Sequence, residues 1–233
     1  MDAMMSSIRS RHSRGNMIGF LKLPLIFTSP TLYAGAIAQF YLLTLLLESG
    51  ELKGEGPMFR KLKEDLALKP LAPGYASDLS DLLGPSWSAK LQDLYLPVTL
   101  DYASQLKSSS DSSLCSALFI LYGALVIGGG RSTQKRVKKV PALRGCGHVL
   151  FDVDEDMMKA RGRFRKAFDE LVRDNPEEEE KLVKEVVRWM GMNNKVVMGI
   201  KCTPTWLKTA VLVTVGAGIA WIASRRVKVV GGR

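Results

Sequence analysis

The residues best suited to chemistry in this chain are its two histidines, because neutral imidazole binds transition metals and titrates near neutral pH. His12 lies in the segment IRSRHS, on a helix predicted over residues 6–21. His148 follows the segment GCG in a predicted loop, and no role is predicted for it. His12 is either an exposed helix residue or, if it faces an apolar pocket, a metal ligand.

Three consecutive glycines, Gly128 to Gly130, interrupt the apolar segment ALFILYGALVIGGGR. Glycine inside a helix costs about 0.5–1 kcal/mol relative to alanine. Three in succession therefore predict either a plain break between two helices or a bend at which a flat ligand can approach the backbone. Arg161 and Arg165 are four residues apart and share one helix face, which is either simply solvated or able to bind carboxylates through paired hydrogen bonds.

The segments that must position these residues all have helical periodicity, and no alternating strand pattern is present. The sequence therefore predicts an all-α protein of six to nine helices in one domain over residues 1–201, with a break expected at Pro97. The predicted helices cover residues 6–21, 31–48, 57–67, 75–83, 86–107, 115–139 and 155–173, followed by a last helix that opens after Pro176.

Composition excludes several classes of protein. Hydrophobic residues make up 46% and charged residues 24%, which is typical of a folded chain. Three widely spaced cysteines, with no Cys-x-x-Cys or Cys/His cluster, indicate a reducing compartment and predict neither a disulfide scaffold nor a zinc site. The formal net charge is +10, but half of that excess lies in residues 206–233, and the body of the chain is mixed in sign. Nucleic acid is therefore not a predicted partner.

The C-terminal segment predicts a membrane anchor. Residues 209–224 (TAVLVTVGAGIAWIAS) carry no charge, have tryptophans near both ends and are flanked by basic residues. Sixteen residues span about 24 Å as a helix, which is slightly short for a bilayer. The alternative is a buried core helix. We expect a linker over residues 202–208, the transmembrane anchor over 209–224 and a basic tail over 225–233, with the bulk of the chain facing the cytosol.

A second uncharged run, residues 23–47, contains Pro24 and Pro30 and several polar side chains. It is better interpreted as a core helix that starts at Ser29-Pro30 than as a second membrane span.

Together, these features resemble the haem oxygenase family over about residues 6–201. RSRHS is similar to the segment that carries the proximal iron ligand, and LFILYGALVIGGGR is similar to the distal helix with its Gly-Gly turn over the haem. Three more segments fit the family pattern. TLYAGAIAQFYLLTLLLE is similar to its second long helix, ARGRFRKAFDEL to the segment with its propionate-facing basic pair, and WMGMNN to its final helix. The fungal haem-oxygenase-like branch is the most similar.

The resemblance implies a role for each candidate residue. His12 takes the place of the iron ligand, and Gly128 and Gly129 take the place of the catalytic glycines that let the helix backbone lie on the porphyrin. Arg9, Arg161 and Arg165 take the places of basic residues that face the haem propionates, and Asn193 that of an asparagine of the last helix. The implied activity is oxidative cleavage of haem to biliverdin, CO and iron, with electrons from a membrane-bound, NADPH-dependent reductase. The implied location is the endoplasmic reticulum membrane, with the mitochondrial outer membrane as the alternative.

One departure from the family pattern bears on activity. Typical members carry Gly-Asp-Leu-Ser-Gly-Gly on the distal helix, and their aspartate organises water near the haem. The corresponding segment here runs from Ala124 to Gly129, so that the aspartate position falls on Leu125, or on Val126 in the shifted register. Three functions therefore stay open: an active haem oxygenase, a non-catalytic haem binder or sensor, and a tail-anchored helical interaction protein.

Overall fold

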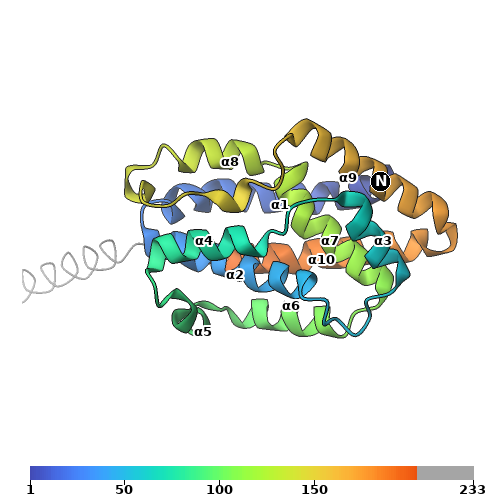
Figure 1. Ribbon diagram of the computed structural model, residues 1–233, viewed down its shortest axis with the longest axis horizontal. Coiled ribbons are helices and arrows are strands. Elements are labelled where there is room, and N and C mark those ends of the chain that lie inside the picture. Colours follow the sequence, from blue (N-terminus) through green and yellow to red (C-terminus); the bar gives the residue numbers. More distant parts are fainter. Residues whose placement is uncertain (204–233) are drawn as a thin grey trace, which may run out of the picture.

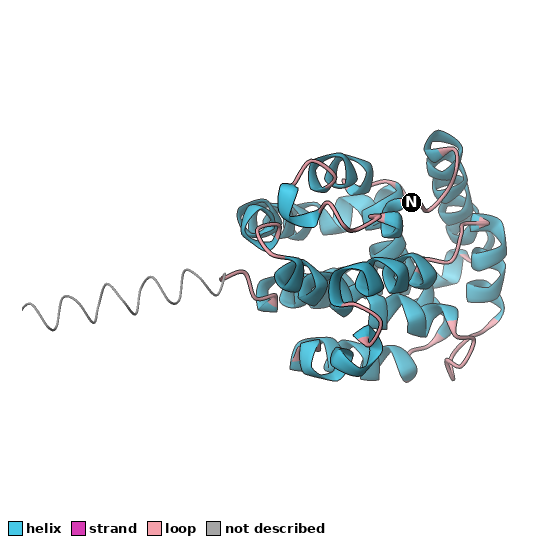
Figure 2. Ribbon diagram, turned by 60° about the vertical axis from the view of Figure 1, so that its left-hand side comes forward, coloured by secondary structure: helices cyan, strands magenta, loops and turns pink. Residues whose placement is uncertain are grey.

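The structure, a computed structural model, describes residues 1–203, apart from the side chains of residues 14–16 and 18–20. Within that range every regular element is a helix, as predicted (Figures 1 and 2). The predicted anchor and basic tail lie outside the described residues, as does all of the linker beyond residue 203. The α-helices are α1 (Asp2–Ile26), α2 (Pro30–Glu48), α3 (Pro57–Leu66), α4 (Ala72–Leu83), α5 (Leu91–Leu94), α6 (Pro97–Lys107), α7 (Asp111–Val126), α8 (Gly130–Val137), α9 (Met157–Asp174) and α10 (Glu179–Gly199). Short 3-10 helices are η1 (Trp87–Lys90), η2 (Pro141–Leu143), η3 (Val149–Phe151) and η4 (Pro176–Glu178).

The described part thus has ten α-helices, one more than the upper limit predicted, because two predicted helices are each divided. The chain predicted as helical over 86–107 is divided at Pro97, as expected, since proline opens α6 and lacks the N–H that would continue α5.

The glycines divide the second of these helices. α7 ends at Val126 and α8 begins at Gly130, with a bend of 46° between the two axes. The backbone N–H groups of Ile127 and Gly128 both donate to the carbonyl of Gly123, at 3.0 and 2.8 Å. A Cβ on Gly128 would lie 2.6 Å from the carbonyl oxygen of Ala124, closer than real Cβ atoms come. The chain follows this tight path because Gly128 has no side chain.

α1 is longer at both ends than the helix predicted over residues 6–21, and Pro24 lies inside it. The helix runs to Ile26, two residues beyond the proline. Proline removes a single backbone donor so near the helix end, and the N–H of Phe27 still donates to the carbonyl of Leu23 at 3.0 Å.

α7 forms the centre of the molecule, with α10 packed along it and α1 packed on α10 (Figure 1). All side chains of α7 except those of Asp111 and Ala124 are buried, as expected of a largely apolar helix at the centre of a protein. The indole N–H of Trp189 on α10 donates to the carbonyl of Ser113 on α7 at 2.9 Å, and its ring stacks on Tyr102 of α6 with centroids 4.8 Å apart.

Among the described residues, α2 is the one helix that is by itself long and apolar enough to cross a membrane. The bent pair α7 and α8 is also long and apolar enough if the two helices are counted together as one broken span. In the structure α2 packs against α4, α6 and α7 and has buried side chains along its length. Buried Gln39 donates to the carbonyl of Leu94 at 2.8 Å and accepts from the hydroxyl of Thr99 at 2.7 Å. These contacts are those of a core helix, as predicted.

Candidate functional site

A cavity of about 350 Å³ lies between α1, α7 and α10, and we call it the α1–α7 cavity. Each helix contributes one face, since the lining residues recur at three- and four-residue spacing. The cavity is mainly apolar, with one imidazole and two amides. Its lining residues are Met5, Ile8, His12, Leu23, Phe119, Ile120, Gly123, Ala124, Ile127, Gly128, Met190, Asn193, Asn194 and Val197.

The cavity brings together three of the residues singled out from the sequence. His12 comes from α1, Gly128 from the bend after α7 and Asn193 from α10. His12 is solvent-exposed. Ala124 is also exposed although its neighbours on α7 are buried, because it faces this space. The imidazole and the bend of the glycine-rich segment therefore line one solvent-accessible cavity.

The segment that carries His12 is held against α10 by two hydrogen bonds. The side-chain amide of Asn194 donates to the carbonyl of Arg11 at 2.9 Å, and the Arg11 guanidinium donates to the carbonyl of Val187 at 3.3 Å. A Cβ on Gly191 would lie 3.0 Å from this guanidinium, so glycine there leaves room for Arg11. Sequence reasoning missed Asn194 and Arg11, although the pair Asn193-Asn194 within an otherwise apolar turn was a visible signal.

Four other predicted site residues do not line the cavity. Arg9 and Arg165 are exposed, and so is Gly129, which follows the bend. Arg161 is half-buried, and its Nε donates to the carbonyl of Val126 at 3.0 Å. That bond satisfies an end carbonyl of α7 and holds α9 to the helix that forms the cavity wall.

A second cavity of about 270 Å³ adjoins the first and shares Leu23, Ala124, Asn193 and Val197 with it. It extends toward α2 and η3, where Tyr33 and Phe151 contribute to its wall. Burial, with a smaller contribution from the nearby Asp78 carboxylate, raises the pKa of the Tyr33 phenol above its ordinary value. This wall is therefore uncharged at neutral pH.

The described lining of the α1–α7 cavity contains no carboxylate. Leu125 faces the second cavity, and the side chain of Val126 is fully buried. In either register, the position that corresponds to the family's distal aspartate is apolar. Among the described residues, the polar side chains that line this cavity, apart from His12, are the amides of Asn193 and Asn194.

No family model matches the sequence, and no curated protein matches it. The fold does match solved structures. It is similar to heme oxygenase 2 from Chlamydomonas reinhardtii, solved without heme, with a TM-score of 0.74 and 26% identity over 87% of this chain and 97% of that chain. It is also similar to heme oxygenase-1 from the cyanobacterium Synechocystis in complex with heme, with a TM-score of 0.71 and 18% identity over 93% of this chain and 97% of that one.

These likenesses extend over nearly the whole of both solved chains, and they show that this chain has an all-helical, haem-oxygenase-like fold. The resemblance to haem oxygenases that the sequence predicted is thereby confirmed. The fungal branch and the tail anchor stay predictions.

Proposed function

We propose that this chain binds haem in the α1–α7 cavity and cleaves it oxidatively to biliverdin, CO and iron. The observation that carries the proposal is the placement of His12 and Gly128 in the lining of one cavity. Neutral imidazole is a common axial ligand of haem iron, and an apolar slot suits a planar macrocycle. A solved structure with a similar fold is a heme oxygenase in complex with heme.

Haem supplies the iron and is itself the molecule that is oxidised, while the chain binds and orients it. In this proposal His12 would bind the iron through a neutral ring nitrogen, and the Gly128–Gly129 bend would leave room for the macrocycle beside the helix backbone. The apolar side chains of Ile120 and Met190 exclude water from the macrocycle, since both line the cavity.

The propionates need cations at the rim of the cavity. Arg161 already uses Nε for the Val126 carbonyl, and its Nη groups are the donors that would bind a propionate. Arg9 and Arg165 are exposed and would bind through long, solvated side chains. Because exposed ion pairs contribute little, we expect Arg161 to contribute more to affinity than either.

Because the cavity lacks the carboxylate of typical family members, a second candidate function is haem binding or sensing without turnover. In an active enzyme the amide of Asn193, which borders both cavities, would have to order the water that aspartate orders in typical family members. Asn193→Ala should therefore reduce turnover more than haem affinity.

Turnover separates these two functions. The full chain is mixed with haem, an NADPH-dependent reductase and oxygen, and biliverdin is measured by its absorption and CO by its capture on ferrous myoglobin. The proposal predicts one biliverdin and one CO for each haem, and loss of both in His12→Ala. Tight haem binding without either product would leave the non-catalytic binder and reject the enzyme.

We further propose that the protein acts on a membrane, beside a membrane-bound reductase. Tethering both proteins to one surface raises their effective concentration for electron transfer. The last turn of α10 and the end of α1 support this location, because Met198 is 58% exposed and Leu21 is 67% exposed close to the end of the described chain. The endoplasmic reticulum membrane, facing the cytosol, is the location we favour, and the mitochondrial outer membrane is the alternative.

A further inference from the structure

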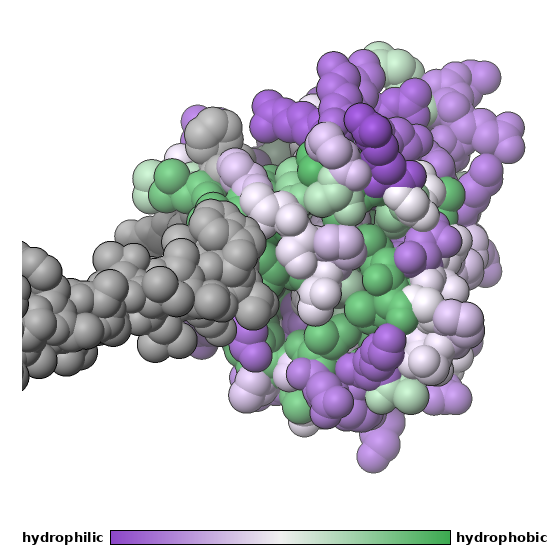
Figure 3. All heavy atoms as spheres, turned by 90° about the vertical axis from the view of Figure 1, so that its left-hand side faces the viewer, coloured by the Kyte–Doolittle hydropathy of each residue, from purple (hydrophilic) through white to green (hydrophobic). Residues whose placement is uncertain are grey.

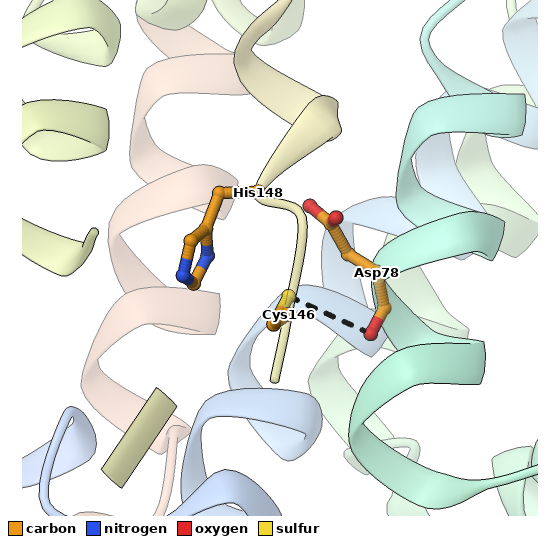
Figure 4. A group of neighbouring side chains, drawn as sticks. All are labelled: Asp78, Cys146 and His148. Atoms are coloured by element: carbon orange, nitrogen blue, oxygen red, sulfur yellow. Dashed lines mark hydrogen bonds between the residues drawn. The ribbon is translucent and has the colours of Figure 1, made fainter. Parts of the chain in front are cut away.

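Three side chains with metal-binding atoms meet on the far side of the second cavity. Asp78 lies on α4, and Cys146 and His148 lie on the loop between η2 and η3 (Figure 4). All three residues are buried, and one ligand atom from each lies within 4.8 Å of the others. Asp78 is separated from His148 by seventy residues of chain, so the spacing of cysteine and histidine in the sequence could not reveal the cluster.

His148 has an unusual environment for a buried histidine. It is only 1% exposed, yet among the described residues neither Nδ1 nor Nε2 has a hydrogen-bond partner. The nearby hydroxyl of Tyr33 is likewise buried without a partner, and the two rings lie 5.7 Å apart. A buried polar group without a partner costs about 1–3 kcal/mol, so these atoms call for a ligand.

The loop is held in place around the cluster by carboxylates of α4. Asp78 accepts hydrogen bonds from the backbone N–H groups of Val149 and Leu150 at 2.9 and 3.0 Å. Asp81 accepts from the N–H of Gly147 at 2.9 Å. Each oxygen of the Asp78 carboxylate accepts one of these bonds and retains a lone pair for a metal. The backbone of His148 is left-handed, with φ of +56°, and its ring lies beside Cys146 (Figure 4).

We propose that Asp78, Cys146 and His148 bind a zinc ion, with the Tyr33 hydroxyl or a water as the fourth ligand. Thiolate, imidazole and carboxylate together suit zinc, whereas magnesium and calcium require oxygen ligands alone. On binding, the Cys146 thiol releases its proton to solvent, and His148 binds through the lone pair of its neutral ring.

The geometry requires a modest contraction. Zinc bonds of about 2.0–2.3 Å place tetrahedral ligand atoms about 3.3–3.7 Å apart, so the widest separation in the cluster has to shorten by about 1 Å. Rotation of the Cys146 and His148 side chains can supply that movement. Gly145 and Gly147 are exposed on either side of Cys146, so the site lies close to the surface.

The consequence would be local. Zinc would tie α4 to the loop that leads into η3, whose Leu150 and Phe151 line the second cavity beside Tyr33. The site would stiffen that wall without touching the α1–α7 cavity. It does not depend on the proposed haem chemistry.

The test uses the full chain, stripped of metal and kept reduced, titrated with Co²⁺ as a spectroscopic probe and with Zn²⁺ in competition. We expect one Co²⁺ per chain with a thiolate-to-metal charge-transfer band and the intense visible bands of tetrahedral cobalt, and displacement of cobalt by zinc. Zinc should also raise the melting temperature of the wild-type chain.

Cys146→Ser and His148→Asn should each weaken zinc binding by at least about 100-fold, a larger loss than is typical of the groups that surround metal ligands. Asparagine is chosen because it tolerates the left-handed backbone. Cys202→Ser and His12→Ala are the controls and should bind zinc as the wild type does.

Absence of the charge-transfer band in the wild-type chain would overturn the proposal, and so would unchanged affinity in both cluster variants. Far-ultraviolet circular dichroism of the variants checks that they fold. If either does not, the wild-type cobalt spectrum and X-ray absorption of the zinc-loaded chain decide, since the proposal requires one sulfur and three nitrogen or oxygen neighbours around the metal.

Discussion

Among single residues, the three consecutive glycines differ in what surrounds them. A Cβ on Gly128 would lie 2.6 Å from the Ala124 carbonyl, and one on Gly130 would lie 2.6 Å from the Leu125 carbonyl. A Cβ on Gly129 would meet only the ends of two side chains, at 3.6 Å or more. Gly128 lines the α1–α7 cavity and Gly129 does not. The close approach of the chain to α7 thus depends on Gly128 and Gly130.

Gly128→Ala should therefore lower the free energy of unfolding by about 1–3 kcal/mol, because backbone atoms rather than a flexible side chain must move. Gly129→Ala, its matched control, should change it by less than about 0.5 kcal/mol. Urea unfolding of the two variants measures both values. Equal losses would mean that the bend does not depend on the missing side chain of Gly128.

The three cysteines should differ in reactivity, because the thiolate is the nucleophile. Burial raises the pKa of Cys115 well above its ordinary value and that of Cys146 to about 12, whereas Cys202 is only half-buried. Native protein treated with iodoacetamide should be alkylated at Cys202 first, and at Cys115 only after unfolding. Peptide mass spectrometry at timed intervals distinguishes the sites, and fast labelling of Cys115 would contradict its buried position.

At the scale of elements, α1 and α10 are joined by a lysine at their ends. Nζ of Lys22 on α1 donates to the carbonyls of Val197 and Ile200 at 3.2 and 2.9 Å, and also to that of Met198. Val197 and Met198 lie in the last turn of α10, where no helical N–H can satisfy the carbonyls, and Ile200 directly follows the helix. A cation there also interacts favourably with the helix dipole. The contact fixes two walls of the α1–α7 cavity relative to each other.

Lys22→Met should lower the free energy of unfolding by about 1 kcal/mol and weaken haem binding severalfold, since it frees α1 from the last turn of α10. Lys195→Met is the control, because Lys195 is an exposed lysine on α10 itself. Chemical unfolding and haem titration measure the two effects. Identical behaviour of both variants would show that the Lys22 contact does not position α1.

The elements also show what the sequence could predict. The start of α2 at Pro30 and the division before α6 at Pro97 follow from proline chemistry and were predicted correctly. The extent of α1 beyond Pro24 was not, because contacts with α10 outweigh the loss of one backbone donor. The pairing of His12 with Gly128 came from the family resemblance, since residues more than a hundred positions apart have no local signal. The cluster of Asp78 with His148 was missed for the same reason.

On the scale of the whole molecule, one face carries exposed apolar side chains. Figure 3 shows hydrophobic side chains in a band across the face near the α1–α2 turn, bordered by hydrophilic ones. Leu21, Leu25 and Met198 are exposed at the ends of α1 and α10. The Lys22 contact places these two helix ends side by side. Such a face suits the proposal that the described domain rests near a membrane.

A chain that ends after residue 203 should stay folded and bind haem as the full chain does, but lose its membrane association, because the predicted anchor over residues 209–224 is removed. Carbonate extraction of membranes from expressing cells, followed by immunoblotting, separates the two forms. Recovery of the full chain in the soluble fraction would contradict the anchor, while leaving the haem site untouched.

The most direct test of the central claim, that His12 binds haem iron within the α1–α7 cavity, is the optical spectrum of the ferric haem complex of the full chain. The wild-type chain should bind one haem and give the spectrum of an imidazole-ligated iron. His12→Ala should bind haem at least about tenfold more weakly and lose that spectrum, and added imidazole should restore it. An unchanged spectrum and affinity in His12→Ala would contradict the account.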